Sequence, residues 1–274
     1  MKNSKASPYD SVCTVRIGLA NSNAEKLEGS ASGILIDAKH GLVITHASVL
    51  YQLVRKLRPG KLEALRKTGS VRGPFFEDKV EAEIILPNNF QNVLAESRNK
   101  NEMESNIQLS MLNSGTNDIQ SFSKYKGTMK MIFECRNLRR TIESTLPSDN
   151  WQFADESNSD LAEKTEENDT RKSFNQEDVA FNLLPSFLLF KIKDFQSSGQ
   201  LLSLRNSRNN RQGDAVEICA SPFGGLSPEV FLNSRSHGII SNLAGPKGVL
   251  IMTDARCVPG SEGGALFFCG SGQR

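Results

Sequence analysis

The sequence predicts an all-β protein made of short antiparallel strands. The segment from Gly213 to Phe268 contains four short apolar stretches, VEICA, HGIIS, GVLIMTDA and GALFF, separated by turns rich in glycine and proline. This spacing is typical of a small antiparallel barrel or sandwich. Two polar stretches, at about 90–125 and 143–176, interrupt the first part of the chain and hold too little apolar surface to offset the entropy of ordering. We therefore expect them to be disordered insertions or surface loops.

Further apolar stretches precede Gly213, and each predicts an element. Residues 11–20, SVCTVRIGLA, alternate and are rich in valine and isoleucine, which predicts a strand. The segment ASGILIDAKHGLVITHASVL predicts two strands around a turn at AKHG, and KVEAEIILPNNF predicts one near 80–86. TMKMIFECRNL is interpreted as a core strand, and DVAFNLLPSFLLFKIKDF as the last strand before a polar linker. The basic stretch 51–68 is interpreted as a solvated face, with docking of an acidic partner as the alternative.

Length and charge exclude several classes of function. The chain has 274 residues, a formal net charge of +2 and 23% charged residues, so a nucleic acid partner is not expected. No run approaches the roughly 18 apolar residues of a membrane span. The N-terminal MKNSKASPYDS lacks the apolar core of a secretory signal, which favours an intracellular compartment.

Cysteine and histidine usage bears on disulfides and metals. The five cysteines form no C-x-x-C pair, and only three histidines are present. We therefore expect buried free thiols in a reducing compartment, and neither a disulfide framework nor a metal site. The residues concerned are Cys13, Cys135, Cys219, Cys257, Cys269, His40, His46 and His237.

Three motifs near the C-terminal end carry a family resemblance. GDAVEICASPFGG, SHGIISNLAG and TDARCVPGSEGGALF follow one another in that order. They resemble the motifs G-x-x-V-x-x-x-G-S-P-F-G, T-x-G-I-V-S and T-D-A-x-x-x-P-G-N-S-G-G-P-L of the trypsin-like serine peptidases of the HtrA and Deg type. Ser32 to Val49 resembles the start of that family's first barrel, G-S-G-x-x-I and then G-x-I-V-T-N-A-H-V. The resemblance implies a trypsin-like double β-barrel.

A narrower family is similar to the same region. SPFG, FLNS, GIISNLAG and TDARCVPGSEGG together resemble the N-terminal half of the peroxisomal leader-peptide-processing proteases, whose chain is similar to two trypsin-like units in tandem. The resemblance implies a serine endopeptidase that removes leader peptides from peroxisomal matrix proteins, cuts itself and needs no cofactor. It places the working triad in the C-terminal unit. We expect peroxisomal protein substrates and self-association, and no nucleic acid or membrane partner.

The resemblance also bears on location. It implies the peroxisomal matrix, which family members reach with a C-terminal S-K-L-type tripeptide. This chain ends in GQR, so the alternative is a cytoplasmic location if the chain is complete as given.

These motifs divide the chain into two units. Residues 1–198 are predicted to form the first barrel, 199–212 a linker, and 213–274 the second barrel. GALFF runs into CGSGQR with no return strand to pair with it, and an unpaired strand edge is a liability. We therefore expect the second barrel to be truncated and the sequence to be a fragment or a short isoform.

The trypsin-like mechanism needs a serine nucleophile, a histidine base and an orienting acid. In the strict register of the resemblance, Ser48 of THASV takes the base position and Ser186 of SFLLFKI takes the acid position. Glu262 of PGSEGG takes the nucleophile position. No catalytic residue is expected in this register, and we predict a catalytically silent unit with a pseudo-active site.

A shifted register would use His46, Asp178 and Ser261 instead. His46 lies two residues before the base position and Ser261 one residue before the nucleophile position, so both would need a local rearrangement. The alternative interpretation is that His46 is a strand-end histidine and that Ser261 is a turn hydroxyl bonded to its own backbone. Cys257, five residues before Glu262, is too far along the loop to be the nucleophile.

Glu262 suggests a hypothesis about the loop itself. A carboxylate placed among backbone amides could accept their hydrogens and fill the oxyanion pocket, which would hold the loop closed without chemistry. A second class of function is therefore a non-catalytic module, derived from a protease, that binds substrate or a partner subunit. Reactivity of a serine toward a fluorophosphonate discriminates between the two classes.

Overall fold

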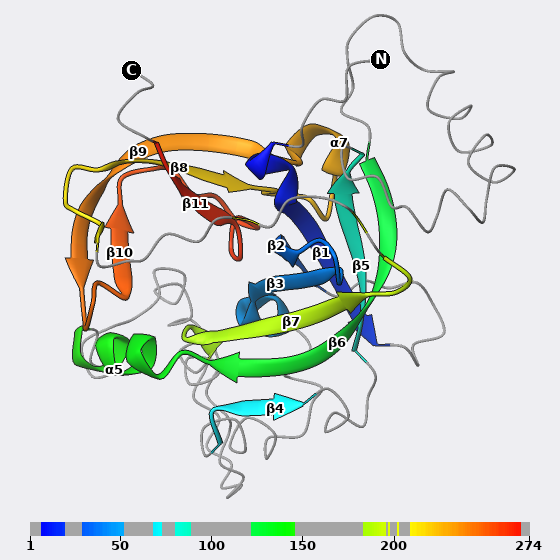
Figure 1. The fold of residues 1–274 in the computed structure, drawn as a ribbon, viewed down its shortest axis with the longest axis horizontal. Coiled ribbons are helices and arrows are strands. Elements are labelled where there is room, and N and C mark those ends of the chain that lie inside the picture. The colour runs from blue at the N-terminus through cyan, green and yellow to red at the C-terminus, as the bar shows by residue number, and fades with distance from the viewer. Residues whose placement is uncertain are drawn as a thin grey trace, which may run out of the picture.

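Strands dominate the computed structural model of this chain. It describes residues 7–19, 29–51, 68–72, 80–88, 122–145, 183–195, 197, 202 and 209–269. The strands form two antiparallel sheets, one of seven strands and one of four (Figure 1). Among the described residues, no helix is long and apolar enough to cross a bilayer.

The first sheet closes into a barrel. It consists of β1 (Val12–Leu19), β2 (Gly29–Asp37), β3 (Leu42–His46), β4 (Ser70–Arg72), β5 (Val80–Pro87), β6 (Phe122–Glu134) and β7 (Ser186–Ile192). The strand order is β4-β6-β5-β1-β2-β3-β7, and β6 also pairs with β7. Six strands therefore form a closed antiparallel ring, with β4 as an extra strand on β6. The all-β prediction and the first barrel are confirmed.

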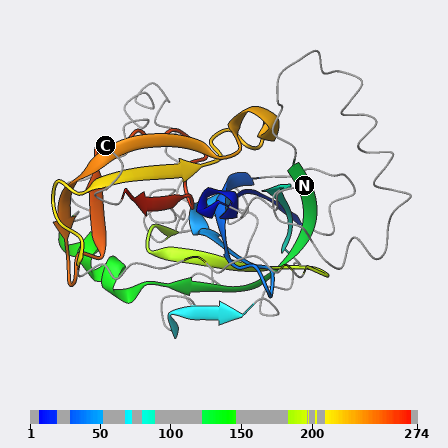
Figure 2. The same ribbon diagram turned by 45° about the horizontal axis from the view of Figure 1, so that its top comes forward.

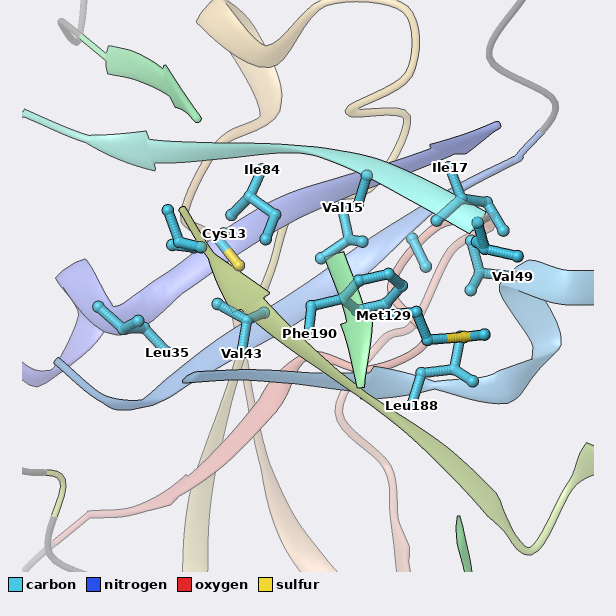
Figure 3. Packing of buried hydrophobic residues seen from close by; sticks show 14 of the residues in the cluster. Cys13, Val15, Ile17, Leu35, Val43, Val49, Ile84, Met129, Leu188 and Phe190 are labelled. Carbon is cyan, nitrogen blue, oxygen red and sulfur yellow. The ribbon is translucent and has the colours of Figure 1, made fainter. Parts of the chain in front are cut away.

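Alternation of side chains fills the barrel with an apolar core. In β7 the residues Ser186, Leu188, Phe190 and Ile192 are buried and the residues between them are partly exposed, as expected for a strand with one buried face. Figure 3 shows Phe190 among apolar side chains contributed by the other strands of the ring, including Val15 and Met129. Because these side chains are buried, their apolar surface is removed from water, which stabilises the barrel.

The second sheet is open among the described residues. It consists of β8 (Ala215–Ala220), β9 (Ser234–Ala244), β10 (Leu250–Thr253) and β11 (Ala265–Phe268), in the order β10-β9-β8-β11. Figures 1 and 2 show this sheet beside the barrel, with β11 on the side nearest to it. All four strands coincide with the apolar stretches that predicted them.

Short helices complete the described part of the chain. They are two 3-10 helices, η1 (Pro8–Ser11) and η2 (Ala47–Leu50), and two α-helices, α5 (Arg136–Thr145) and α7 (Pro228–Phe231). Thr141 of α5 lies against Gly245 in the turn between β9 and β10, so this helix joins the barrel to the second sheet.

Four details differ from the sequence prediction. The first polar stretch ends earlier than expected, because β6 already begins at Phe122. The core strand ends at Glu134, and the following RNL opens α5, whose last turn includes the first residues of the second polar stretch. Strand β4 and helix α7 were not predicted. The remainder of both polar stretches, most of 51–68 and most of the linker lie outside the described residues.

Candidate functional site

The PGSEGG loop between β10 and β11 docks on the first barrel through Ser32 of β2. The carbonyl oxygen of Gly260 accepts hydrogen bonds from the Ser32 amide at 3.0 Å and from the Ser32 hydroxyl at 2.6 Å. The same hydroxyl accepts the amide hydrogen of Ser221, in the SPFG motif, at 2.8 Å. Ser32 is fully buried. One side chain thus joins the barrel to two loops of the second unit.

Glycine is required at position 263 of this loop. Gly263 has φ of +83°, and a Cβ atom there would lie 2.6 Å from Thr45 Oγ1 and 2.9 Å from the His46 amide nitrogen. It would also collide with the carbonyl oxygen of Ser32. Both the left-handed backbone and the close approach exclude a side chain. Gly263 therefore brings the loop directly onto the end of β3.

Glu262 binds an amide of its own loop. Its Oε2 accepts the amide hydrogen of Gly260 at 2.8 Å, while the rest of the side chain is exposed. The acceptance of a loop amide by Glu262, as the sequence suggested, is therefore observed. The donor lies two residues before the acceptor, so the bond closes a small ring within the turn.

Ser261 has a local role in the same turn. Its amide donates to the carbonyl of Val258 at 3.0 Å, and its hydroxyl oxygen accepts the Val258 amide hydrogen at 3.3 Å. Its carbonyl accepts from the Gly264 amide at 3.0 Å. These reciprocal bonds are those of a side chain that stabilises a turn.

His46 is the last residue of β3 and caps helix η2. Its Nδ1 accepts the Ser48 amide hydrogen at 3.2 Å and lies 2.8 Å from the Ser48 hydroxyl, so this nitrogen must carry a lone pair. The ring proton is therefore on Nε2, which donates to the carbonyl of Leu184 at 2.8 Å. Both ring nitrogens of His46 are thus hydrogen-bonded to groups other than the Ser261 hydroxyl. Sequence reasoning identified His46 as a strand-end residue but not as a cap.

Burial sets the charge state of this histidine. Removal from water lowers the pKa of His46 below its ordinary value, and the Leu184 carbonyl and the Glu262 carboxylate oppose that change without reversing it. The imidazole is therefore held neutral, in one tautomer, against the strand end.

Two of the three residues that the strict register places at the triad positions, Ser48 and Ser186, lie next to His46. Ser48 contacts the ring directly, and Ser186 begins β7, one residue before the Phe187 that pairs with His46. Glu262, the third, precedes the Gly263 that packs on the His46 amide. Asp178, the acid of the shifted register, lies outside the described residues.

A cleft lies next to this loop, between the two units. It has a volume of about 480 Å³ and is lined by Arg16, Gly29, Ser30, Phe223, Gly225, Leu226, Pro259 and Gly260. Arg16 of β1 donates to the Gly225 carbonyl at 2.5 Å and pairs with Glu83 at 2.9 Å, which fixes one wall. Phe223 has φ of +52°, an uncommon backbone for an aromatic residue, and is 38% exposed. Leu226 is 83% exposed.

All five cysteines are free. Cys13 and Cys219 are buried as expected, but Cys257 is exposed, because it lies on the loop rather than in a strand. Partial desolvation and the Glu262 carboxylate raise the pKa of the Cys257 thiol above its ordinary value. Its thiolate is therefore disfavoured, which is the opposite of what a cysteine nucleophile needs.

Sequence comparison finds two similar proteins, both peroxisomal proteases. The chain is 52% identical over 56 residues to the human peroxisomal leader peptide-processing protease. The aligned segment covers 20% of this chain and 9% of that protein. It is 32% identical over 123 residues to the mouse peroxisomal leader peptide-processing protease. The aligned segment covers 43% of this chain and 19% of that protein. The matches thus span about a fifth or less of the relatives' length.

Two further comparisons concern families and solved structures. No protein-family model matches the chain. The crystal structure of Deg5 is similar with a TM-score of 0.43 and 14% sequence identity, over 96% of this chain and 76% of that one. The resemblance drawn from the motifs is confirmed at the level of sequence: this chain is similar to the peroxisomal leader peptide-processing proteases of human and mouse.

Proposed function

We propose that this chain is part of a serine endopeptidase that processes peroxisomal matrix proteins by removing their leader peptides, and that this unit is itself catalytically silent. The names of the human and mouse relatives support the first part. The hydrogen bond from the Gly260 amide to the Glu262 carboxylate carries the second.

The argument from this bond concerns the oxyanion hole. In trypsin-like enzymes the amides of the nucleophile and of the residue two positions before it stabilise the negative oxygen of the tetrahedral intermediate. Here those positions are Glu262 and Gly260. The Gly260 amide already donates to a carboxylate, and that carboxylate would repel a second anion beside it. The pocket is thus occupied by the residue that stands in the nucleophile position.

The histidine supports the same conclusion. A general base must offer a nitrogen lone pair to the nucleophile and use the other nitrogen to bond an orienting acid. The lone pair of His46 faces Ser48, and its N–H donates to the Leu184 carbonyl. Its geometry serves a helix cap instead of proton transfer.

Fluorophosphonate labelling of the 274-residue chain, read by intact mass spectrometry, tests whether this unit lacks a catalytic serine. We expect no adduct on the folded protein, with trypsin labelled in parallel as the positive control. An adduct that is lost in Ser261→Ala would overturn the proposal, and His46→Ala would then be the next variant to label.

The second candidate function is a protease-derived binding or regulatory module. The cleft beside the loop favours it, because Phe223 and Leu226 leave apolar surface exposed where a peptide could contact both units. A fluorescent leader peptide that binds the chain without cleavage, and binds more weakly to Leu226→Ser, would support this function. The proposed substrates are peroxisomal proteins, and the proposed location is the peroxisomal matrix.

A further inference from the structure

A second cluster of reactive side chains lies away from the loop, on the face of the second sheet that η1 covers. Glu217 of β8 is the cross-strand partner of His237 of β9. On the other side of β8, Glu217 is paired with Phe267 of β11, and the Cys269 amide donates to the Ala215 carbonyl. Residues two apart share a face of a strand, so Glu217, His237 and Cys269, which directly follows β11, project from the same face of the sheet.

The donor atoms of these three residues already lie close together. One carboxylate oxygen, one imidazole nitrogen and the Cys269 sulfur all lie within 4.8 Å of one another. Some point therefore lies no more than about 2.8 Å from each of the three atoms, against Zn–N, Zn–O and Zn–S distances of about 2.0–2.3 Å. The ligand atoms therefore need to move inward by at most about 0.5–0.8 Å each. The His237 side chain is 73% exposed and is free to make that movement.

The carboxylate provides a second, independent observation. Glu217 is only 2% exposed, and its Oε1 accepts no hydrogen bond among the described residues, although burying an unpaired carboxylate oxygen is costly. Two nitrogens, Arg235 Nε and His237 Nε2, approach Oε1 no closer than 3.5 Å. Its other oxygen, Oε2, accepts the Tyr9 hydroxyl at 2.6 Å. The buried oxygen that lacks a hydrogen bond is thus the one that lies 3.5 Å from the imidazole of His237.

We propose that Glu217, His237 and Cys269 form a binding site for a divalent transition metal ion, with Zn²⁺ as the best match. Thiolate, imidazole and carboxylate together are a donor set that zinc accepts, whereas magnesium and calcium prefer oxygen ligands alone. Three protein ligands leave a fourth position for water. On binding, the Cys269 thiol releases its proton to solvent, and the metal takes the place of that proton on sulfur.

Neighbouring residues have defined roles in this site. Tyr9 is a positioning residue, because its hydrogen bond to Oε2 fixes the carboxylate and leaves Oε1 directed at the metal. Arg235, whose guanidinium also lies over the Tyr9 ring at 5.1 Å, is the cation that the metal must displace from Oε1. Since the Arg235 side chain is half exposed, it can turn to solvent. A bound ion would tie β8, β9 and β11 to one another, and through Tyr9 to η1.

Cobalt substitution tests the site directly. Titration of the reduced, untagged 274-residue chain with Co²⁺ is expected to give the charge-transfer absorption of a cobalt thiolate, and one equivalent of Zn²⁺ should abolish it. Cys269→Ser should lose the thiolate absorption. The control is Cys257→Ser, which removes an exposed thiol outside the cluster and should keep it. Absence of the absorption in the native chain, or its persistence in Cys269→Ser, would refute the site.

Two further variants guard against a folding defect. His237→Ala changes an exposed side chain, so its circular dichroism should match the native chain while its Zn²⁺ affinity falls by at least about tenfold, with His40→Ala as the control. Tyr9→Phe should weaken Zn²⁺ by about 10- to 100-fold and keep the thiolate absorption, because it removes only the orienting hydroxyl. Equal Zn²⁺ affinity of His237→Ala and His40→Ala would mean that the ion binds elsewhere on the chain.

Discussion

The Glu262 carboxylate closes the PGSEGG turn by binding the Gly260 amide. Its bond to the Gly260 amide is charge-assisted, but the side chain is exposed, so water screens it. We expect Glu262→Ser to lower the free energy of unfolding by about 1 kcal/mol. The matched control is Glu229→Ser, where an exposed glutamate accepts from the Ser227 hydroxyl instead of a backbone amide. Urea unfolding measures both, and an unchanged stability of Glu262→Ser would contradict this role.

His46 predicts a pH dependence with a definite sign. Its pKa in the folded state lies below its ordinary value of 6.5, because burial disfavours the imidazolium. As pH falls through 6.5, the unfolded state therefore gains a proton that the folded state resists, and stability decreases until the folded-state pKa is reached. Above this window the contribution is fully present.

The matched variant is His46→Asn, which keeps a side chain able to cap η2 but does not titrate. Unfolding free energies at about pH 7.5 and 5.5 should differ less in this variant than in the native chain. His40→Asn, on the exposed turn after β2, controls for the loss of a histidine. An equal decrease in the native chain and His46→Asn would rule out His46 as the source.

At the scale of elements, the loop between β10 and β11 depends on a glycine for two separable reasons. Gly263 and Gly213 both have positive φ, of +83° and +87°, but a Cβ at Gly213 would meet nothing within 4 Å. We expect Gly213→Ala to cost about 1 kcal/mol from backbone strain alone. Gly263→Ala should cost about 2–4 kcal/mol, because the loop must also move off Ser32 and Thr45. Similar losses in thermal unfolding would show that the loop does not dock on β2 and β3.

Elements with strong local signals could be predicted from sequence, and those defined by tertiary contacts could not. Strand β1 is rich in valine and isoleucine, and the apolar residues of β2 and β3 flank the AKHG turn, so the apolar pattern and the turn residues predict the same strands. Helix α5 was missed because RNLRRTIEST is short and rich in arginine, and its buried face is little more than Thr141 and Ile142. Strand β4 has three residues, and its pairing with β6 rather than its own sequence makes it a strand.

At the scale of the whole molecule, Ser32 is the polar joint between the barrel and the second unit. Ser32→Ala would leave the Ser221 amide without its acceptor in a buried interface, so we expect a loss of about 2 kcal/mol. Ser236→Ala removes a hydroxyl that likewise accepts an amide hydrogen, from the exposed Arg256, and should cost about 0.5 kcal/mol. Denaturant unfolding followed by circular dichroism gives both values. The joint would be refuted if Ser32→Ala were no more costly than its control.

How far the sites could be predicted depends on how far apart in sequence their parts lie. The bond between Gly260 and Glu262 spans two residues, so the motif itself suggested it. The cluster of Glu217, His237 and Cys269 was not foreseen, and no metal site was expected, because these residues are 20 and 32 positions apart and only the register of β8, β9 and β11 brings them together. Spacing rules detect metal ligands within a loop, but not ligands brought together by strand pairing.

The capping role of His46 has a consequence for evolution. The imidazole holds the start of η2 through the amide and hydroxyl of Ser48, so a substitution of histidine for Ser48, the proposed base position, would remove the hydroxyl that His46 now bonds. A replacement of His46 made first would instead remove the cap. Whichever of these two substitutions comes first, it produces an intermediate in which the end of β3 is less stable. On the proposed register, a serine at position 262 would give no catalytic activity until both substitutions had been made. On the proposed strict register, a working triad would therefore require several substitutions, and the first of them would lower stability without restoring activity.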